Sequence, residues 1–299
     1  MAQGVEEVEI ASMRLFTSII KVPLPEIDSN AKLYVRLAKR LIESASSSST
    51  PVSQAALRLV SAVLRERPNA DIPKYDWEEN IAFILNRIKP DLQEPAKQGD
   101  RDLQVAAFNF LRAIINRKEP IAEVYGVMDV VREVMITSSE PPIPDLARSV
   151  YTRFVLDYFP EELKGFSKQL DFLVANLRYP TSRGRQSVME VIMFVLDRKA
   201  EDAVQSMLVT FFLPLIVAFA TDDNEQCRDS AALIIHKIFE RADKERTKIF
   251  RGQMLKWLNP EADALWRSAG LQCWTIYVDV HTTATKEAGT VYALSLIHI

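Results

Sequence analysis

FFLPLIVAFATDDNEQCRDSAALIIHKIF, residues 211–239, is the stretch that decides the fold of this chain of 299 residues. An apolar helical pattern that carries Pro214 runs into a tight acidic turn at Asp222 and Asp223. A second helical pattern follows, with an early arginine, Arg228, then two small residues and an apolar run. Turn residues between two periodic apolar segments are typical of two helices that fold back on each other. The stretch therefore predicts one helix–turn–helix unit.

The same outline recurs along the chain. Hydrophobic periodicity predicts helices over 5–21, 31–44, 52–67, 76–89, 101–117, 121–136, 146–159, 161–177, 186–199, 202–221, 225–241, 244–258 and 261–280. The second helix of each pair begins near residues 52, 101, 143, 182, 224 and 261. These starts recur with roughly the 40–47-residue period of HEAT and armadillo arrays. We therefore predict an all-α fold, an α-solenoid of about six HEAT-like helix pairs over residues 1–281.

Recurring helix interiors support this period. QAALRLVSAVLRER, QVAAFNFLRAIINRK, DLARSVYTRFVLDYF, GRQSVMEVIMFVLDRK and QCRDSAALIIHKIFER each place small residues early and bulky apolar residues late. Small residues let neighbouring helices approach, and the bulky ones fill the space between layers. Such an array usually offers a long binding surface rather than a catalytic pocket.

Composition narrows the possible classes. Hydrophobic residues make up 48% of the chain, which supports a large buried core, and only 8 glycines occur, which disfavours a turn-rich β fold. The net charge of −3 gives no overall attraction to nucleic acid, so any RNA contact would need a local basic patch. Cys227 and Cys273 lie in apolar helical patterns and are expected to be buried free thiols in a reducing compartment.

The N-terminus does not read as a signal peptide, and the longest apolar run does not read as a membrane span. MAQGVEEVEI at residues 1–10 lacks the apolar core of a signal peptide. The apolar run 207–220 falls short of the roughly 20 residues that a membrane span needs, so we predict a buried helix and no membrane association. Residues 282–299 read as an irregular tail. Within it, LSLIHI at 294–299 looks like a translated sequencing-library adapter, the alternative being a short genuine apolar tail.

Enzymatic chemistry has little support in the sequence. The three histidines, His236, His281 and His298, stand in no zinc-binding spacing. The glycine-rich loops that cradle phosphates are absent from the sequence, and so is the G-x-S-x-G turn of a serine hydrolase. We therefore predict no catalytic residues, no metal, no cofactor and no small-molecule substrate.

One basic segment is the candidate binding site. RYPTSRGR, residues 178–185, places Arg178, Arg183 and Arg185 next to Tyr179. In a solenoid the inter-helix loops line one edge, so the arginines could bind phosphates while the tyrosine stacks on a base, giving a site for RNA or another partner. The alternative is a solvated or salt-bridged turn.

A second basic segment spans residues 237–256, with seven basic and three acidic residues. It could bind a nucleic-acid backbone, or its lysines and arginines could complement helix dipoles.

Long stretches of the chain resemble one family. They are KQLDFLVANLRYPTSRGRQSVMEVIMFVLDRK, MRLFTSIIKVPLPEIDSNAKLYVRLAKRLI with QAALRLVSAVLRER, and FNFLRAIINRK with AEVYGVMDVVREVMIT. Together they resemble the giant HEAT-repeat proteins of the small-subunit processome, the family of U-three-snoRNA-associated protein twenty, also called down-regulated in metastasis. These sequence stretches are most similar to those of fungal members. Because family members are several times longer, the chain reads as an internal fragment.

The resemblance implies a nucleolar scaffold without enzymatic activity that helps 18S rRNA mature. Its implied partners are small-subunit processome proteins, pre-ribosomal RNA and the snoRNA complex. The family has no short motif whose residues can be transferred to this chain. Two other classes remain: a protein-only HEAT-repeat adaptor or transport receptor, and an enzyme with a helical fold. We also expect a fragment of an array to be poorly soluble or frayed at its ends, because apolar end faces lack their neighbours.

Overall fold

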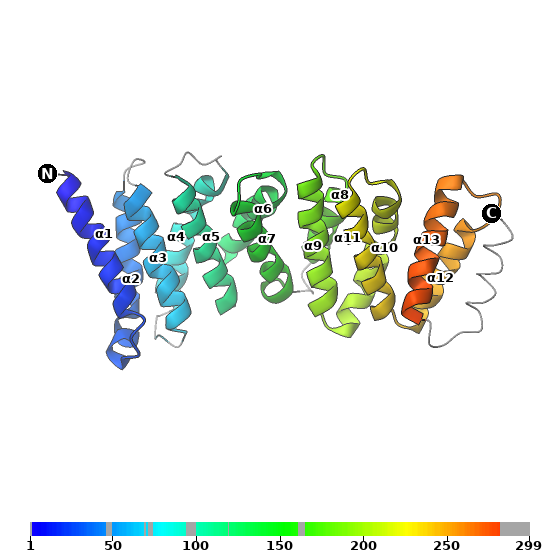
Figure 1. Cartoon of the computed structure of the whole chain (residues 1–299). Coiled ribbons are helices and arrows are strands. Elements are labelled where there is room, and N and C mark those ends of the chain that lie inside the picture. The colour runs from blue at the N-terminus through cyan, green and yellow to red at the C-terminus, as the bar shows by residue number, and fades with distance from the viewer. Residues whose placement is uncertain are drawn as a thin grey trace. The chain divides into compact units, whose positions relative to one another are not determined.

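The computed structural model describes residues 2–45, 50–68, 70, 74–93, 100–118, 120–160 and 165–281. Within these ranges the chain forms thirteen α-helices and one π-helical turn, with no β-strand. It divides into two compact units, residues 1–160 and 161–299 (Figure 1). Every segment predicted to be helical contains a helix, and the all-α prediction is confirmed. The predicted tail 282–299, with its possible adapter sequence, lies outside the described residues.

The first unit contains two rows of helices. One row consists of α1 (Ala2–Ile19), α3 (Thr50–Glu66), α5 (Asp100–Arg117) and α7 (Ile143–Arg153), each in contact with the next. The second row consists of α2 (Pro25–Ser44), α4 (Lys74–Gln93) and α6 (Ala122–Thr137), again in sequence order. Contacts between rows join α2 to α3, α4 to α5 and α6 to α7, which makes three helix pairs preceded by α1. This is the layered stacking of HEAT repeats.

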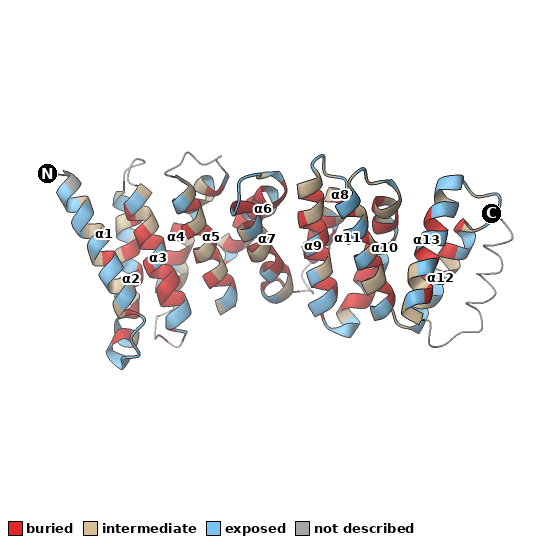
Figure 2. Ribbon diagram, viewed as in Figure 1, coloured by how far each residue is buried: buried red, intermediate tan, exposed pale blue. Residues whose placement is uncertain are grey.

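Helix α2 illustrates how the sequence produces these layers. Pro25 stands at its first turn, where a missing backbone N–H is tolerated. Its buried residues recur three or four positions apart, as one apolar face requires: Ile27, Ala31, Val35, Ala38 and Ile42. The opposite face is exposed, and Figure 2 shows buried residues gathered on the sides where helices meet. By contrast, α3 lies between α1, α2 and α5 and is buried on most of its circumference.

An aromatic cluster packs the end of the first unit. The π-helical turn η1 (Phe154–Tyr158) follows α7 directly. Tyr125 of α6 contacts the rings of Phe154, Tyr158 and Phe159 at centroid distances of 5.4–5.9 Å. The Tyr158 hydroxyl accepts a hydrogen bond from the backbone N–H of Ile121 at 2.8 Å. The turn is therefore tied to the beginning of α6.

The second unit repeats the two-row arrangement. Helices α8 (Phe166–Asn176), α10 (Glu201–Thr221) and α12 (Lys244–Trp257) form one row, and α9 (Ser182–Arg198), α11 (Glu225–Arg241) and α13 (Ala264–His281) form the other. Three helices begin with side-chain caps: Thr181 accepts a hydrogen bond from the N–H of Gly184, Asn224 from that of Cys227 and Asp243 from that of Arg246. Such caps satisfy backbone donors at the helix start and fix where each helix begins.

Helix α10 is the apolar centre of the second unit. It contacts α8, α9, α11, α12 and α13. By length and composition this helix could also cross a membrane. Half of its most apolar stretch is buried within the fold. A helix that packs against several neighbours needs apolar residues on more than one side, which accounts for the buried half, whereas Val209 and Leu213 of the same helix are exposed. Pro214 is accommodated inside the helix.

Several predicted boundaries differ from the observed ones. Helix α2 begins at Pro25 rather than at residue 31, because proline is tolerated in the first turn. Helix α4 continues through Pro90 to Gln93, although the sequence predicted its end at that proline. Helix α9 begins at Ser182, as the spacing of the second helices predicted, rather than at residue 186, where its predicted apolar periodicity began. The last difference changes the candidate site, because half of the predicted loop is helical.

Candidate functional site

The candidate segment 178–185 is divided between a short loop and a helix. Helix α8 ends at Asn176, and the N–H of Tyr179 donates to the Asn176 carbonyl at 3.1 Å, which turns the chain. Thr181 then caps α9. Arg178 and Tyr179 thus lie in the loop, whereas Arg183 and Arg185 lie in the first turn of α9. The expectation of a single arginine-rich loop is wrong, because the Thr181 cap starts the helix earlier.

Arg185 is buried and holds the loop from inside. Its Nη1 donates to the carbonyl oxygens of Tyr179 at 3.0 Å and Pro180 at 3.2 Å. Its Nη2 pairs with the carboxylate of Asp222 at 2.7 Å and with that of Asp223. The side chains of Arg185 and Asp222 are only 9% and 3% exposed, so this ion pair is shielded from solvent. Arg185 is therefore a structural clamp between consecutive repeats and does not face an external phosphate.

The acidic turn at 222–224 supports the same clamp. Asp222 Oδ1 also accepts the N–H of Asn224 at 2.9 Å, and the Asp222 carbonyl accepts from Arg228 Nη1 at 2.8 Å. Burial lowers the pKa of the Arg185 guanidinium, but the hydrogen bond and charge of Asp222, with a further contribution from Cys227, outweigh it, so the net direction is upward. The arginine therefore remains charged in its buried position.

The other three candidate residues lie at the surface of this connection. Arg178 is exposed, and Tyr179 and Arg183 are half-buried. Arg178 lines a cavity of about 210 Å³ together with Arg185, Asp222 and Asp223. Asp223 is 88% exposed at its side chain, so carboxylates lie next to the arginines. The connection therefore carries positive arginine side chains next to negative carboxylates, which reduces its attraction for a polyanion.

The second basic segment, 237–256, is partly paired with acidic side chains. Lys237 pairs with Glu240 at 2.8 Å and with Asp197 at 3.4 Å, and Arg246 pairs with Asp243 at 3.1 Å and Glu245 at 3.0 Å. These contacts neutralise part of the local positive charge. Lys244, Lys248 and Lys256 of α12 are exposed.

A set of arginines that the sequence did not single out connects the second helices of the pairs. Arg67, after α3, donates to the carbonyls of Ile20 and Val22 at the end of α1. Arg117, at the end of α5, donates to the Arg67 carbonyl at 3.2 Å and lies over the Trp77 ring.

Arg241 repeats this arrangement in the second unit. At the end of α11 it donates to the carbonyls of Leu196, Asp197 and Lys199 and pairs with Glu201. A helix C-terminus leaves carbonyl oxygens without intrahelical partners, and an arginine from the next repeat satisfies them. The sequence contained a sign of these contacts, since an arginine stands at or next to the end of each of the segments LRER, INRK and FER.

The remaining candidate chemistry is sparse. Among the residues that the structure describes, no three His, Cys, Asp or Glu side chains come together as a metal site. Both cysteines are buried and free. His236 lies at the surface between Glu240, at 3.4 Å, and Asp279, at 3.7 Å, and so joins α11 to α13. These contacts give His236 a role in packing.

Comparisons with known structures define the fold. The karyopherin Kap121p, bound to the extreme C-terminus of the protein phosphatase Cdc14p, matches 99% of this chain and 34% of its own with a TM-score of 0.52 at 13% identity. Kap95p, in a complex with RanGDP, matches 88% of this chain and 37% of its own with a TM-score of 0.51 at 12% identity. At this identity the likeness concerns the fold alone, and it agrees with the predicted HEAT-like solenoid class.

Sequence comparison is more specific. No family model matches the chain. U3 small nucleolar RNA-associated protein 20 from Saccharomyces cerevisiae is 30% identical over 277 residues, or 91% of the chain, and its counterpart from Schizosaccharomyces pombe is 28% identical over 86% of the chain. The chain spans about 10% of the length of these curated relatives. Over most of its length the chain is therefore similar to U3 small nucleolar RNA-associated protein 20, which agrees with the resemblance that its sequence indicated.

Proposed function

We propose that this chain is a non-catalytic scaffold segment that acts in small-subunit ribosome biogenesis. The observation that carries the proposal is its similarity, over 91% of its length, to a relative named for its association with U3 small nucleolar RNA. The relative's name associates it with U3 small nucleolar RNA. We extend that setting to this chain: the nucleolus as its location, the small-subunit processome as its assembly and maturation of 18S rRNA as its process.

The arrangement of helices suits a scaffold. Each pair adds a connecting loop and part of a helix face to the surface, so contacts can be distributed over many repeats. Affinity in such a surface accumulates from modest contacts over a large area. The described residues offer no group of side chains arranged to hold a metal, and His236 contacts Glu240 and Asp279. Binding is therefore the activity that this architecture supports best.

Within this function, the connection between α8 and α9 is the proposed contact for pre-ribosomal RNA or a processome protein. Arg178 and Arg183 would bind phosphate or carboxylate groups, and Tyr179 would stack on a base or pack on a side chain. Arg185 contributes indirectly, because its hydrogen bonds to the carbonyls of Tyr179 and Pro180 fix the loop that carries the other residues. The contact is modest, since Asp223 lies beside it.

The test is to tag the full-length protein that carries this chain in its own cells, crosslink it to RNA with ultraviolet light and sequence the RNA. Enrichment of small-subunit precursor RNA and U3 snoRNA supports the scaffold. Co-purification of processome proteins without crosslinked RNA would leave a scaffold that binds protein alone. Absence of both would contradict the proposal and favour an adaptor or transport receptor.

The proposed contact is tested in the same cells with the double substitution Arg178→Glu and Arg183→Glu. We expect crosslinking near α9 to fall while the protein still assembles. Arg198→Glu at the opposite end of α9 is the control, since Arg198 is exposed like Arg178 and lies over the neighbouring Phe194 ring. Equal loss in both variants would show that the effect is general charge and not this loop.

A further inference from the structure

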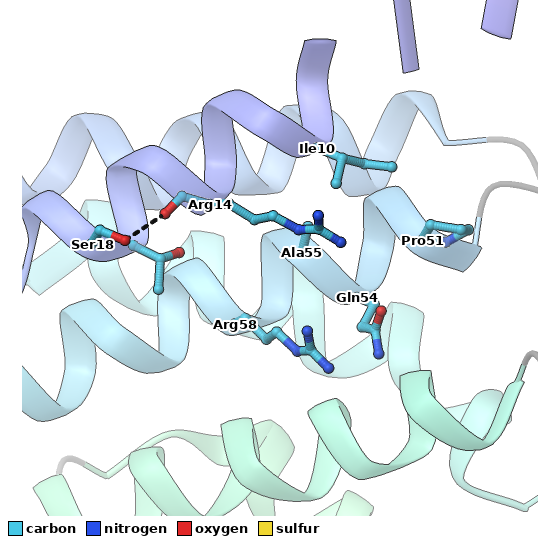
Figure 3. Close-up of a pocket in the computed structure, with 8 residues that line it drawn as sticks. Ile10, Arg14, Ser18, Pro51, Gln54, Ala55 and Arg58 are labelled. Atoms are coloured by element: carbon cyan, nitrogen blue, oxygen red, sulfur yellow. Dashed lines mark hydrogen bonds between the residues drawn. The ribbon is translucent and has the colours of Figure 1, made fainter. Parts of the chain in front are cut away.

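A groove of about 320 Å³ lies between α1 and α3 in the first unit, far in sequence from the segment considered above. Arg14, Thr17 and Ser18 line it from α1, and Gln54 and Arg58 line it from α3. Ile10, Pro51 and Ala55 complete its wall. Figure 3 shows the side chains of Arg14 and Arg58 extending in the same direction along the two helices, with Gln54 beyond Arg58. Two guanidinium groups thus border one groove.

These two arginines differ from the structural arginines of the fold. Arg67 and Arg185 are buried and bind carbonyl and carboxylate oxygens. Arg14 and Arg58 are exposed, and neither side chain has an ion pair or hydrogen bond within the part of the chain that the structure describes. Nothing in the packing of the described helices uses their charge. Their donors remain available for an acceptor from outside.

A third donor in the groove also lacks an acceptor. Gln54 Nε2 is buried from solvent and has no hydrogen-bond partner among the described residues. A buried donor without an acceptor is destabilising, typically by about 1–3 kcal/mol, so such groups in proteins are expected to have a partner. The hydroxyl groups of Thr17 and Ser18 donate to the carbonyls of Met13 and Arg14 within α1, at 2.7 and 3.1 Å. The groove therefore concentrates unpaired donors and positive charge, which suits an anionic acceptor.

The position of the groove on α3 adds to this preference. Pro51 and Gln54 belong to the first turns of this helix, which begins at Thr50. The N-terminal end of a helix carries a partial positive charge and favours anions. The helix dipole and the two guanidinium groups thus both favour the binding of an anion.

The surroundings favour one carboxylate over a polyphosphate chain. Glu7 lies on α1 one turn before Ile10 and is exposed, so a polyanion that follows the groove would meet a like charge. None of the eight lining residues is aromatic, so a base has no ring to stack on. Ile10, Pro51 and Ala55 instead give an apolar wall. We propose that the groove between α1 and α3 binds the glutamate or aspartate side chain of a partner peptide whose neighbouring residues are apolar.

In this mode the peptide carboxylate accepts hydrogen bonds from the exposed guanidinium groups of Arg14 and Arg58, next to the Gln54 side chain that also lines the groove. Charge-assisted bonds from a guanidinium are about twice as strong as neutral ones and can be bidentate. Apolar residues on either side of the carboxylate pack on the Ile10 and Pro51 surface. Specificity then comes from the combination of one charge with apolar flanks.

The experiment is a titration of the full chain, labelled with ¹⁵N, with the peptide N-acetyl-Leu-Glu-Leu-amide. The expected result is a saturable shift of the Gln54 side-chain amide signal. The matched probe N-acetyl-Leu-Gln-Leu-amide, which has the same shape without the charge, should produce on the order of tenfold weaker binding or none. A twelve-nucleotide single-stranded RNA serves as the polyanion probe.

Amino-acid substitutions distinguish binding in the groove from a general effect of the positive charge of the chain. Arg14→Gln with Arg58→Gln should abolish the Gln54 shift, whereas Arg65→Gln, an exposed arginine farther along α3, should leave it intact. Unchanged circular dichroism confirms that both variants fold. The proposal is overturned if the glutamine peptide binds equally, if the double variant still binds, if neither peptide shifts the signal, or if the RNA alone does so. The last result would make the groove a nucleic-acid site instead.

Discussion

At the scale of single residues, the arginines of this chain divide into structural and available groups, and burial separates them. Arg67, Arg185 and Arg241 bind carbonyl or carboxylate groups of the preceding or following repeat. Arg14 and Arg58 are exposed and keep their donors for a partner. The residue type alone does not distinguish these five arginines. Their different roles follow from the neighbouring helix that each one meets.

Replacing Arg185 by alanine should destabilise the second unit strongly. The change leaves the carboxylate of Asp222, only 3% exposed, without its partner, and breaking a buried ion pair in this way typically costs about 3–5 kcal/mol. Chemical denaturation followed by circular dichroism measures the loss. Arg178→Ala is the control and should change the free energy of unfolding by less than about 0.5 kcal/mol, since the residue is exposed. Equal stability of the two variants would argue against the clamp.

The cysteines should resist thiol reagents while the chain is folded. Burial raises the pKa of Cys273 to about 12, so at pH 8 the thiolate fraction is on the order of one in ten thousand. Burial and the charge of Asp222 also raise the pKa of Cys227, although Arg185 opposes this. Labelling with iodoacetamide, counted by mass spectrometry, should be slow in buffer and complete in denaturant. Rapid modification of both thiols in buffer would contradict their burial.

At the scale of elements, close helix packing depends on which positions are small. In α13 a Cβ built on Gly270 would lie 3.1 Å from Trp257 Cβ of α12. The Trp257 indole is itself stacked on Trp266 and Phe212, at centroid distances of 5.4 and 6.2 Å, so it has little freedom to move away. In α12 a Cβ on Gly252 would meet nothing within 4 Å. These two glycines therefore form a matched pair.

Gly252→Ala should stabilise the chain and Gly270→Ala should not. Alanine is favoured over glycine inside a helix by roughly 0.5–1 kcal/mol, and position 252 has space for the methyl group. At position 270 the clash with Trp257 should offset this gain and lower the melting temperature. Thermal denaturation of the two variants makes the comparison. A rise in melting temperature for both would mean that α12 and α13 can move apart at little cost.

At the scale of the whole molecule, each compact unit contains its own helix rows. In a repeat array stability is approximately a sum over repeats and their nearest neighbours, so a unit cut between repeats should keep its core. Residues 1–160 include α1 to α7 and the aromatic cluster of Tyr125, Phe154, Tyr158 and Phe159. A fragment that ends inside a helix pair should be less stable.

A fragment of residues 1–160 should therefore show helical circular dichroism and a cooperative heat transition. A fragment of residues 1–142 retains α6 but lacks α7, the helix that packs against α6. It should melt at a lower temperature and less cooperatively. A fragment 1–160 without a cooperative transition would show that the first unit depends on more of the chain than its own helices.

The sequence by itself determined the fold class, the thirteen helical segments and the repeat period, and it indicated the similarity to U3 small nucleolar RNA-associated protein 20. These depend on local periodicity and on long stretches of similarity, which need no knowledge of contacts. Its errors lie where a local rule had two outcomes: proline allowed α2 to begin at Pro25 but did not end α4 at Pro90, and the Thr181 cap drew Arg183 and Arg185 into α9.

Only the tertiary structure decided which arginines face outward. Arg185 pairs with Asp222, which lies 37 positions later, and Arg241 with carbonyls more than 40 positions earlier. Likewise, Arg14 and Arg58 border one groove only because α1 packs against α3. A side chain is buried or available according to the helix that packs against it, and that helix comes from another repeat. Local pattern therefore specifies the elements, and packing between repeats assigns their charged residues to structure or to binding.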